Sequence, residues 1–419
     1  MLLREGLMSK RWVVLSLDAL ATSAIGVYGS PWNETSSIDK MATLGTVWDR
    51  AIATSDDSVE QLAQLWGQTV GDDRWVNHCH KVGRVELYLN AGPQAVELAK
   101  LAEKFAFDQC TFTESVPESL GQDALACEEI ELTSMAKLLL PVLERLSDTS
   151  ESAAPDWSVM WVHSDSLARH WDAPRWLFPI EEDEEDEEPI DQVEWSLADF
   201  EAQSRAGGVP ESTTQKPPAI FESVSVPFFA LSPDAHPDWI TSWMQTYGCQ
   251  VRLLDRLVSI LLDAIQASGE NIGLAMIGTS GISMGQNGWI GHRAGTIRSP
   301  QIHVPVILFD GEGAGLRLPG LRSINEVMHY LVASEEGSSR ITPEQWASDG
   351  TADDTVIETV SHRAERVLTT QQWFFVREGD HTRLFLKPDD RDDMNDIADR
   401  CRDVVESMES TVSSSSREP

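Results

Sequence analysis

The sequence has few cysteines, few basic residues and no long apolar run. Its five cysteines stand singly, and no two of them form a C-x-x-C pair, which argues against a disulfide framework and against a structural zinc site. The first apolar run, from Trp12 to Leu17, is too short for a signal peptide. No stretch approaches the roughly 18 consecutive apolar residues of a membrane span. We therefore expect a protein of the reducing cytoplasm that does not cross a membrane.

The shortage of basic residues sets the net charge. The chain has 32 Lys and Arg against 68 Asp and Glu, which gives a net charge of −36. A surface this negative repels phosphate backbones and anionic lipids, so we expect neither a nucleic acid nor a membrane as partner. The 419 residues, 41% of them hydrophobic, are enough for one large domain, or for a large domain with a small one.

The apolar residues that are present indicate an α/β fold. Four short runs are apolar at consecutive rather than alternate positions: Trp12 to Leu17, Val159 to Val162, Ile272 to Ile277 and Val304 to Phe309. Such runs are typical of strands that are covered on both faces, as in the parallel part of an α/β sheet. Between them, residues 94–107 and 253–264 place apolar side chains at helical spacing. The pattern predicts an α/β sandwich.

Two segments lack this periodicity. Glu181 to Glu188 is a run of eight acidic residues bounded by Pro179 and Pro189. Eight like charges do not pack against a core, so we expect residues 180 to 220 to be a solvated, disordered insertion. A calcium-binding or partner-docking acidic patch is the alternative. The Ser-rich end, Ser407 to Pro419, predicts a frayed, disordered tail.

After the first apolar run, a series of residues recurs at fixed spacing: Asp18, Gly26, Tyr28, Gly29, Thr35, Ile38, Asp39, Ala42, Gly45, Asp49, Arg50 and Ser55. This series resembles the start of the sulfatase family in the alkaline-phosphatase superfamily, where an apolar strand ends in paired aspartates and a G-x-Y-G turn follows. Three later blocks, from Trp157, Met276 and Glu365, resemble further family motifs in the same order.

The resemblance implies a fold and its boundaries. It implies an alkaline-phosphatase/sulfatase-like sandwich, in which helices flank a mixed, mostly parallel central sheet. The α/β domain would span residues 10–335, and a small C-terminal α+β subdomain would span residues 355–406. Since one fold can carry many activities, function has to be read from the site.

The metal positions implied by the resemblance are mostly lost. A sulfatase site, as the family has it, holds a divalent cation with several carboxylates and an amide. Asp18 keeps one of these positions, but its neighbour is Ala19, and the Asp-His pair of the late block is replaced by Thr279 and Ser280. Because one carboxylate binds a hard cation weakly, no cofactor is expected beyond a residual calcium or magnesium ion at Asp18. A role for Asp18 as a turn or cap residue is the simpler expectation, and residual metal binding is the alternative.

The nucleophile implied by the family is a Cys or Ser in C/S-x-P-S-R, which is oxidised to formylglycine. An ungapped alignment places it at Asp57, and a one-residue gap would place it at Ser58. The Pro, Ser and Arg of the motif are missing at either register. Oxidation to formylglycine is therefore not expected.

The cationic and acid-base positions have changed as well. His163 keeps a family position, whereas the second histidine of that block falls on Ala168, with His170 nearby. The lysine that binds substrate in the family falls on His292, a side chain that is mostly neutral at pH 7, and Arg293 beside it is a candidate replacement. A further family histidine falls on Asn287.

These substitutions leave three functional hypotheses. The leading one is a catalytically inactive sulfatase-like protein, a pseudosulfatase, which binds an unknown protein or a small anionic ligand or has a regulatory role. The alternative is an active ester hydrolase of sulfatase or phosphatase type with rearranged chemistry. Its candidate residues are Asp57 or Ser58 as nucleophile, with Asp18, His163, His170, His292 and Arg293 for acid, base and charge. The third is a scaffold protein that docks a partner through the acidic run.

Two other patterns have simpler explanations. His78, Cys79 and His80 could hold a transition metal, but too few ligands are present and we expect a surface loop there. The fifteen tryptophans could line an aromatic cleft, but core packing explains them more simply.

Overall fold

The computed structural model describes residues 10–114, 124–147, 156–179, 216–292, 297–311, 315–333, 355–361 and 365–415. The acidic run lies outside these residues, as does the predicted insertion except for 216 to 220. Arg293 and the predicted end of the α/β domain at 335 also lie outside them.

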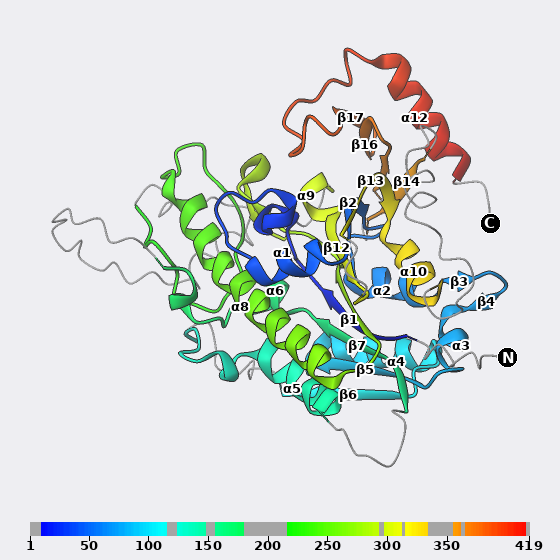
Figure 1. Ribbon diagram of the computed structural model, residues 1–419. Helices are drawn as coiled ribbons and strands as arrows, with labels where there is room; N and C mark the ends of the chain where they lie inside the picture. Colours follow the sequence, from blue (N-terminus) through cyan, green and yellow to red (C-terminus); the bar gives the residue numbers. More distant parts are fainter. Residues whose placement is uncertain are drawn as a thin grey trace, which may run out of the picture.

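An eight-stranded sheet forms the centre of the α/β domain (Figure 1). Its strands, in spatial order, are β13 (Leu316–Ser323), β2 (Thr46–Ile52), β12 (His303–Phe309), β9 (Ile272–Gly278), β1 (Arg11–Leu17), β7 (Trp157–Ser164), β5 (Arg84–Asn90) and β6 (Gln109–Thr113). All neighbours pair in parallel except β12, which is antiparallel to both β9 and β2. The four predicted strands are β1, β7, β9 and β12, and every residue of the first three is buried.

Helices cover both faces of this sheet. On one face lie α1 (Ser36–Thr43), α5 (Ser134–Ser147) and α8 (Asp238–Ser268), and on the other lie α2 (Ser58–Trp66), α3 (Trp75–Cys79), α4 (Pro93–Lys104) and α10 (Val327–Ala333). Alternate residues of β1 enter the two cores, Val13 and Leu15 on the first side and Trp12 and Val14 on the second. The mixed, mostly parallel sheet with flanking helices is therefore confirmed. None of the described helices combines the length and the apolar character that a membrane span requires.

The aromatic and His-Cys-His patterns have structural roles. Nine tryptophans are among the largest fully buried side chains: Trp12, Trp48, Trp66, Trp75, Trp157, Trp161, Trp171, Trp239 and Trp243. His78 and Cys79 end the helix α3 rather than lying in a surface loop, because Cys79 packs into the second core. His80 pairs with Asp108 at 3.0 Å.

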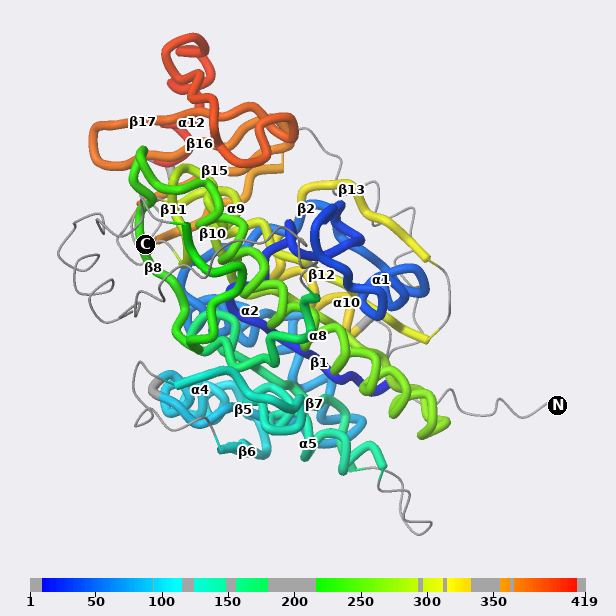
Figure 2. Tube along the Cα trace, turned by 90° about the vertical axis from the view of Figure 1, so that its left-hand side faces the viewer, coloured from blue at the N-terminus to red at the C-terminus, as the bar shows by residue number. Residues whose placement is uncertain are grey.

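The C-terminal unit is a separate antiparallel sheet with one helix, and Figures 1 and 2 show it at one end of the α/β domain. Its elements are β14 (Ile357–Val360), β15 (Arg366–Thr369), β16 (Trp373–Glu378), β17 (His381–Leu386) and α12 (Arg402–Ser415). The prediction of a frayed tail is wrong for residues 407 to 415, which belong to α12. The helix extends there because Met408 and Val412 continue its apolar face, and Val412 packs on Leu368 and Phe375.

Candidate functional site

The strand β1 carries the buried carboxylate of Asp18 to the carboxyl edge of the sheet. Asp18 is 2% exposed, and its two oxygens accept hydrogen bonds from the hydroxyl groups of Ser58 and Thr279. Thr279 directly follows β9, the parallel neighbour of β1, and Ser58 is the first residue of α2. We call Asp18, Ser58 and Thr279 the Asp18 cluster. It joins three segments that are far apart in the sequence.

Ala19 and Ser280, the residues next to this cluster in the sequence, help to fix the conformation of the loop after β1. Ala19 has a left-handed backbone with φ of 55°, and its amide donates to Ser280 Oγ at 2.9 Å. The hydroxyl of Tyr247, from α8, donates to the Ala19 carbonyl at 2.7 Å and accepts from the Ala21 amide at 3.0 Å. Ala19 and Ser280, which stand at family metal positions, thus fix the loop after β1. The contribution of Tyr247 has no signal in the sequence.

The structure brings Ser58, and not Asp57, to Asp18. The carboxylate of Asp57 accepts from the Glu60 amide at 2.8 Å and caps the N-terminus of α2. A cap of this kind satisfies one of the free amides of the first helical turn. Ser58, the residue that the gapped alignment assigns to the nucleophile, is therefore the one whose side chain contacts Asp18.

The side chains that follow Ser58 do not restore the motif. Gln61 is fully buried. Its carbonyl oxygen accepts from the amides of Thr54 and Ser55 at 2.6 and 3.1 Å, and its amide group donates to Asn325 at 2.9 Å. Gln61 therefore pairs the free backbone amides of the turn between β2 and α2. Its side chain is neutral, so it supplies no positive charge near the Asp18 cluster.

His163 and Asp165 lie at the same edge of the sheet. The Nδ1 atom of His163 is 3.1 Å from Ser16 Oγ, and its buried Nε2 has no hydrogen-bond partner in the part of the chain that the structure describes. Burial raises the pKa of Asp165, the nearby His163 opposes that rise, and the charge of Asp18 adds to it. Two carboxylates and one imidazole thus interact electrostatically here. The sequence analysis missed Asp165, which directly follows β7 but stands three positions after the end of the predicted apolar run.

The remaining predicted residues are not joined to this group. His170 follows α6 (Ser166–Arg169), and burial lowers its pKa while Asp172 opposes the shift. His292 follows the short strand β11 (Trp289–Gly291). Neither histidine forms a hydrogen bond or ion pair with Asp18 within the described ranges. Asn287 donates to the Asp392 carbonyl at 2.8 Å and so contacts the C-terminal unit.

The donor set of the Asp18 cluster does not fit a calcium or magnesium ion. Calcium takes six to eight oxygen ligands, and magnesium takes six, of which one or two are usually protein carboxylates whose oxygens are free to bind it. Here one carboxylate is present, and the two neutral hydroxyls direct their protons at it. Across the described residues, no group of three or more His, Cys, Asp or Glu side chains is placed to hold a metal.

Comparisons with known proteins identify the fold. No protein-family model matches the sequence, and no curated protein sequence matches it. Solved structures do match over nearly the whole chain. The phosphonate monoester hydrolase of Agrobacterium radiobacter is 12% identical, with a TM-score of 0.61 and coverage of 96% of this chain and 95% of that one.

Two further structures extend this similarity. The 2-O GAG sulfatase BT1596 is 11% identical, with a TM-score of 0.60 over 97% of this chain and 91% of its own. A protein of the alkaline phosphatase superfamily from Vibrio parahaemolyticus is 12% identical, with a TM-score of 0.52 over 92% of this chain and 81% of its own. The resemblance seen in the sequence is thus confirmed at the level of architecture: the chain has the fold of the sulfatases and of the wider alkaline phosphatase superfamily.

Proposed function

We propose that this chain is a pseudosulfatase, a sulfatase-fold protein that binds a ligand or partner and does not hydrolyse esters. One observation carries the proposal: both oxygens of Asp18 are engaged by the hydroxyls of Ser58 and Thr279. The resemblance implies that these places once held a metal carboxylate, a nucleophile and a second metal ligand. A closed hydrogen-bonded cluster now stands there, and its role is structural.

Electrostatics support the same proposal. Ester hydrolysis of this type needs positive charge that stabilises the oxyanions of the transition state. The edge of β1 and β7 instead carries the carboxylates of Asp18 and Asp165, which are close enough to repel each other, and the nearby Arg169 is paired with Asp165 at 3.3 Å. A sulfate or phosphate ester would be repelled at this edge.

One observation favours the alternative, an active hydrolase with rearranged chemistry. Ser58 Oγ donates to the Asp18 carboxylate, which is the arrangement of a hydroxyl nucleophile with its base. In that case Asp18 would accept the Ser58 proton while Oγ attacks the ester, and His163 would be the candidate acid for the leaving group. We place this second because a carboxylate base next to an anionic ester disfavours the approach of the substrate.

Hydrolysis assays on the full chain decide between the two. Aryl sulfate, aryl phosphate and a phosphonate monoester would be incubated with the protein and with magnesium, calcium, manganese or zinc. We expect no turnover above that of Asp18→Asn. Metal-dependent or metal-independent hydrolysis that disappears in Ser58→Ala would overturn the proposal. Asp57→Asn is the matched control, since asparagine keeps the helix cap; loss of activity there would instead identify Asp57 as the nucleophile.

We also propose a cytoplasmic location. The support is that all five cysteines are free, as is usual in a reducing compartment. Fractionation of the native cells with an antibody against the chain tests this, and recovery in an extracellular fraction would contradict it.

A further inference from the structure

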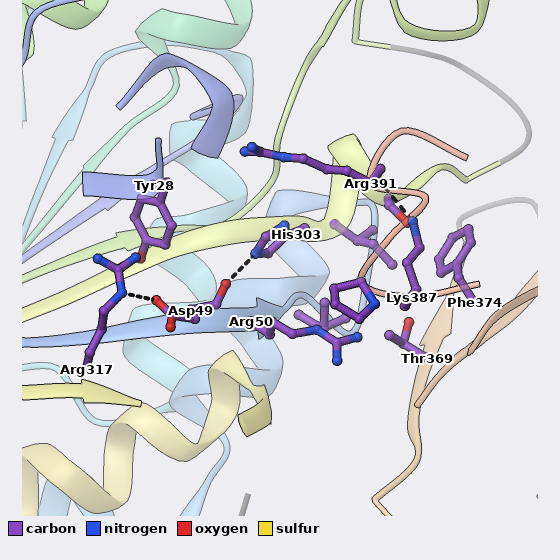
Figure 3. A pocket seen from close by; sticks show the side chains of 13 residues that line it. Tyr28, Asp49, Arg50, His303, Arg317, Thr369, Phe374, Lys387 and Arg391 are labelled. Carbon is purple, nitrogen blue, oxygen red and sulfur yellow. Dashed lines mark hydrogen bonds and ion pairs between the residues drawn. The ribbon is translucent and has the colours of Figure 1, made fainter. Parts of the chain in front are cut away.

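A cavity of about 220 Å³ lies between the α/β domain and the C-terminal unit (Figure 3). Tyr28, Arg50 and His303 come from the α/β domain, and Lys387 and Arg391 come from the C-terminal unit on the opposite side. None of the three residues of the Asp18 cluster lines this cavity. It is a second candidate site, independent of the first.

Two of the four cationic side chains around the cavity are paired with carboxylates. Arg317 Nε donates to Asp49 Oδ1 at 2.7 Å. Lys387 Nζ lies 2.6 Å from Asp393 Oδ1, in a pair that is almost fully buried. These two ion pairs contribute no net charge to the cavity.

The other two cations are not neutralised. Arg50 donates to the carbonyls of Thr370 and Gln371 at 3.0 and 2.8 Å and to Gln371 Oε1 at 2.9 Å, all of which are neutral acceptors. Arg391 is exposed, and its guanidinium forms no hydrogen bond or ion pair with the described part of the chain. In Figure 3 the Arg391 side chain runs past His303, and Arg50 lies on the other side of that ring. The lining therefore carries about two positive charges in excess.

The cations of the lining also lie close enough to His303 to act on its charge. Burial of its ring lowers the pKa of His303 to about 4; the Asp49 carbonyl opposes this shift, and the charges of Arg391, Arg50 and Lys387 add to it. A local positive field stands out in a chain whose net charge is −36. Fields of this kind concentrate ions of opposite sign.

The side chains that line the cavity indicate what kind of ligand would fit it. Guanidinium groups bind planar or tetrahedral oxyanions through paired N–H donors. Phe374 and Pro388 add an apolar wall. The volume of about 220 Å³ is below the roughly 300–1,000 Å³ of sites for drug-sized ligands, so the ligand is small.

We propose that this cavity binds a small organic dianion, of which a phosphate monoester is the simplest form, with the oxyanion between Arg50 and Arg391 and the organic group against Phe374. The proposal gives the pseudosulfatase a ligand, but it does not depend on the loss of hydrolysis at Asp18. The doubly charged group matches the two guanidinium groups that have no carboxylate partner among the described residues, and a singly charged sulfate ester matches them less well.

Calorimetric titration of the full chain with phenyl phosphate tests the proposal, with inorganic phosphate and phenyl sulfate as the other two ligands. We expect phenyl phosphate to bind most tightly and Arg391→Gln to weaken it by about tenfold or more, the usual effect of losing a charged hydrogen-bond pair. Arg400→Gln is the matched control, because Arg400 is an exposed arginine of the same unit and does not line the cavity. It should bind as the wild type does.

Several outcomes would overturn the proposal. The first is that millimolar phenyl phosphate does not bind at all. The second is that Arg400→Gln weakens binding as much as Arg391→Gln does, which would indicate unspecific attraction. The third is that Asp18→Asn weakens binding while Arg391→Gln does not. Phenol release measured in the same samples separates the two proposals. Hydrolysis abolished by Ser58→Ala would remove the pseudosulfatase function, while binding that depends on Arg391 would leave the cavity site intact.

Discussion

Replacing Lys387 with methionine tests how the C-terminal unit is held on the α/β domain. The Lys387 and Asp393 side chains are 7% and 0% exposed. Asp393 also accepts from the amide and hydroxyl of Ser299 in the α/β domain, at 2.6 and 2.8 Å. Asp393 therefore links the two units, and Lys387 supplies its counter-charge.

The magnitude follows from the geometry. At 2.6 Å and an effective dielectric constant of about 20, the attraction is about 6 kcal/mol. Desolvation of the ammonium group offsets part of it, so removal of one partner from such a pair costs about 3–5 kcal/mol. Urea unfolding at pH 7, with hydrogen exchange of the β16 amides as a local probe, measures this loss. Arg383→Met is the control, since its surface pair with Glu378 at 3.7 Å contributes at most about 1 kcal/mol.

The loss should depend on pH in a stated direction. Burial raises the pKa of Asp393 above its ordinary value of 3.8, and Lys387 is the strongest of the groups that oppose this rise. Without Lys387 the pKa rises further, and a protonated Asp393 no longer needs a cation. The difference between variant and wild type is therefore largest at neutral pH and shrinks as the pH falls through the raised pKa.

A second substitution tests the same reasoning. In Lys387→Met/Asp393→Asn most of the stability should return, because no uncompensated charge remains and asparagine tolerates the left-handed φ of 57° at this position. A loss below about 1 kcal/mol in Lys387→Met, or a loss that is the same at pH 5 as at pH 7, would refute the argument.

Three further predictions concern the α/β domain. Thr279→Val should lower the free energy of unfolding, measured in urea, by about 1.5–3 kcal/mol, because the buried Asp18 carboxylate loses a hydrogen-bond donor. Thr279→Ser keeps the hydroxyl and should lower it less. Equal losses in the two variants would contradict this. Tyr247→Phe removes both hydrogen bonds to the loop after β1 and should cost about 1–3 kcal/mol, with faster exchange of the Ala21 amide; unchanged exchange would count against it. The pKa of His303 is about 4 in the folded chain, against an ordinary value of 6.5. As the pH falls, His303 therefore becomes protonated in the unfolded chain before it does so in the folded chain. Wild-type stability should thus drop by up to about 3 kcal/mol as the pH falls from 6.5 toward 4, and His303→Gln should lack that drop.

Four of the eight strands of the central sheet could be predicted because they are continuous apolar runs. β1, β7, β9 and β12 each bury nearly every residue, and such runs have few other places in a globular fold. One residue beside the site is set by close backbone contact: a Cβ at Gly281 would lie 2.0 Å from the Pro300 carbonyl oxygen, so only glycine fits there. The helix α12 was missed because its serine content suggested a frayed end, while its apolar face needs the partner sheet to be recognised.

The candidate site could be predicted only in part. Asp18 could be predicted from the end of the first strand, and Thr279 from the motif that follows β9. The choice between Asp57 and Ser58 could not be predicted, because it depends on which residue begins α2, and the two possible alignments differ there by one residue. The cavity could not be predicted at all. Arg50 and Arg391 are 341 positions apart in the sequence, and whether a surface arginine is paired is a property of the assembled fold.

The position of β1 in the middle of the sheet has a consequence for synthesis. Its neighbour β7 is complete only at Ser164 and its other neighbour β9 only at Gly278. Until then one long apolar edge of β1 has no partner, and such an edge pairs readily with other chains. At about 5–20 residues per second, translation leaves this edge open for tens of seconds. The emerging chain therefore passes through a stage at which protection by a chaperone matters, and a product cut short before β9 should aggregate.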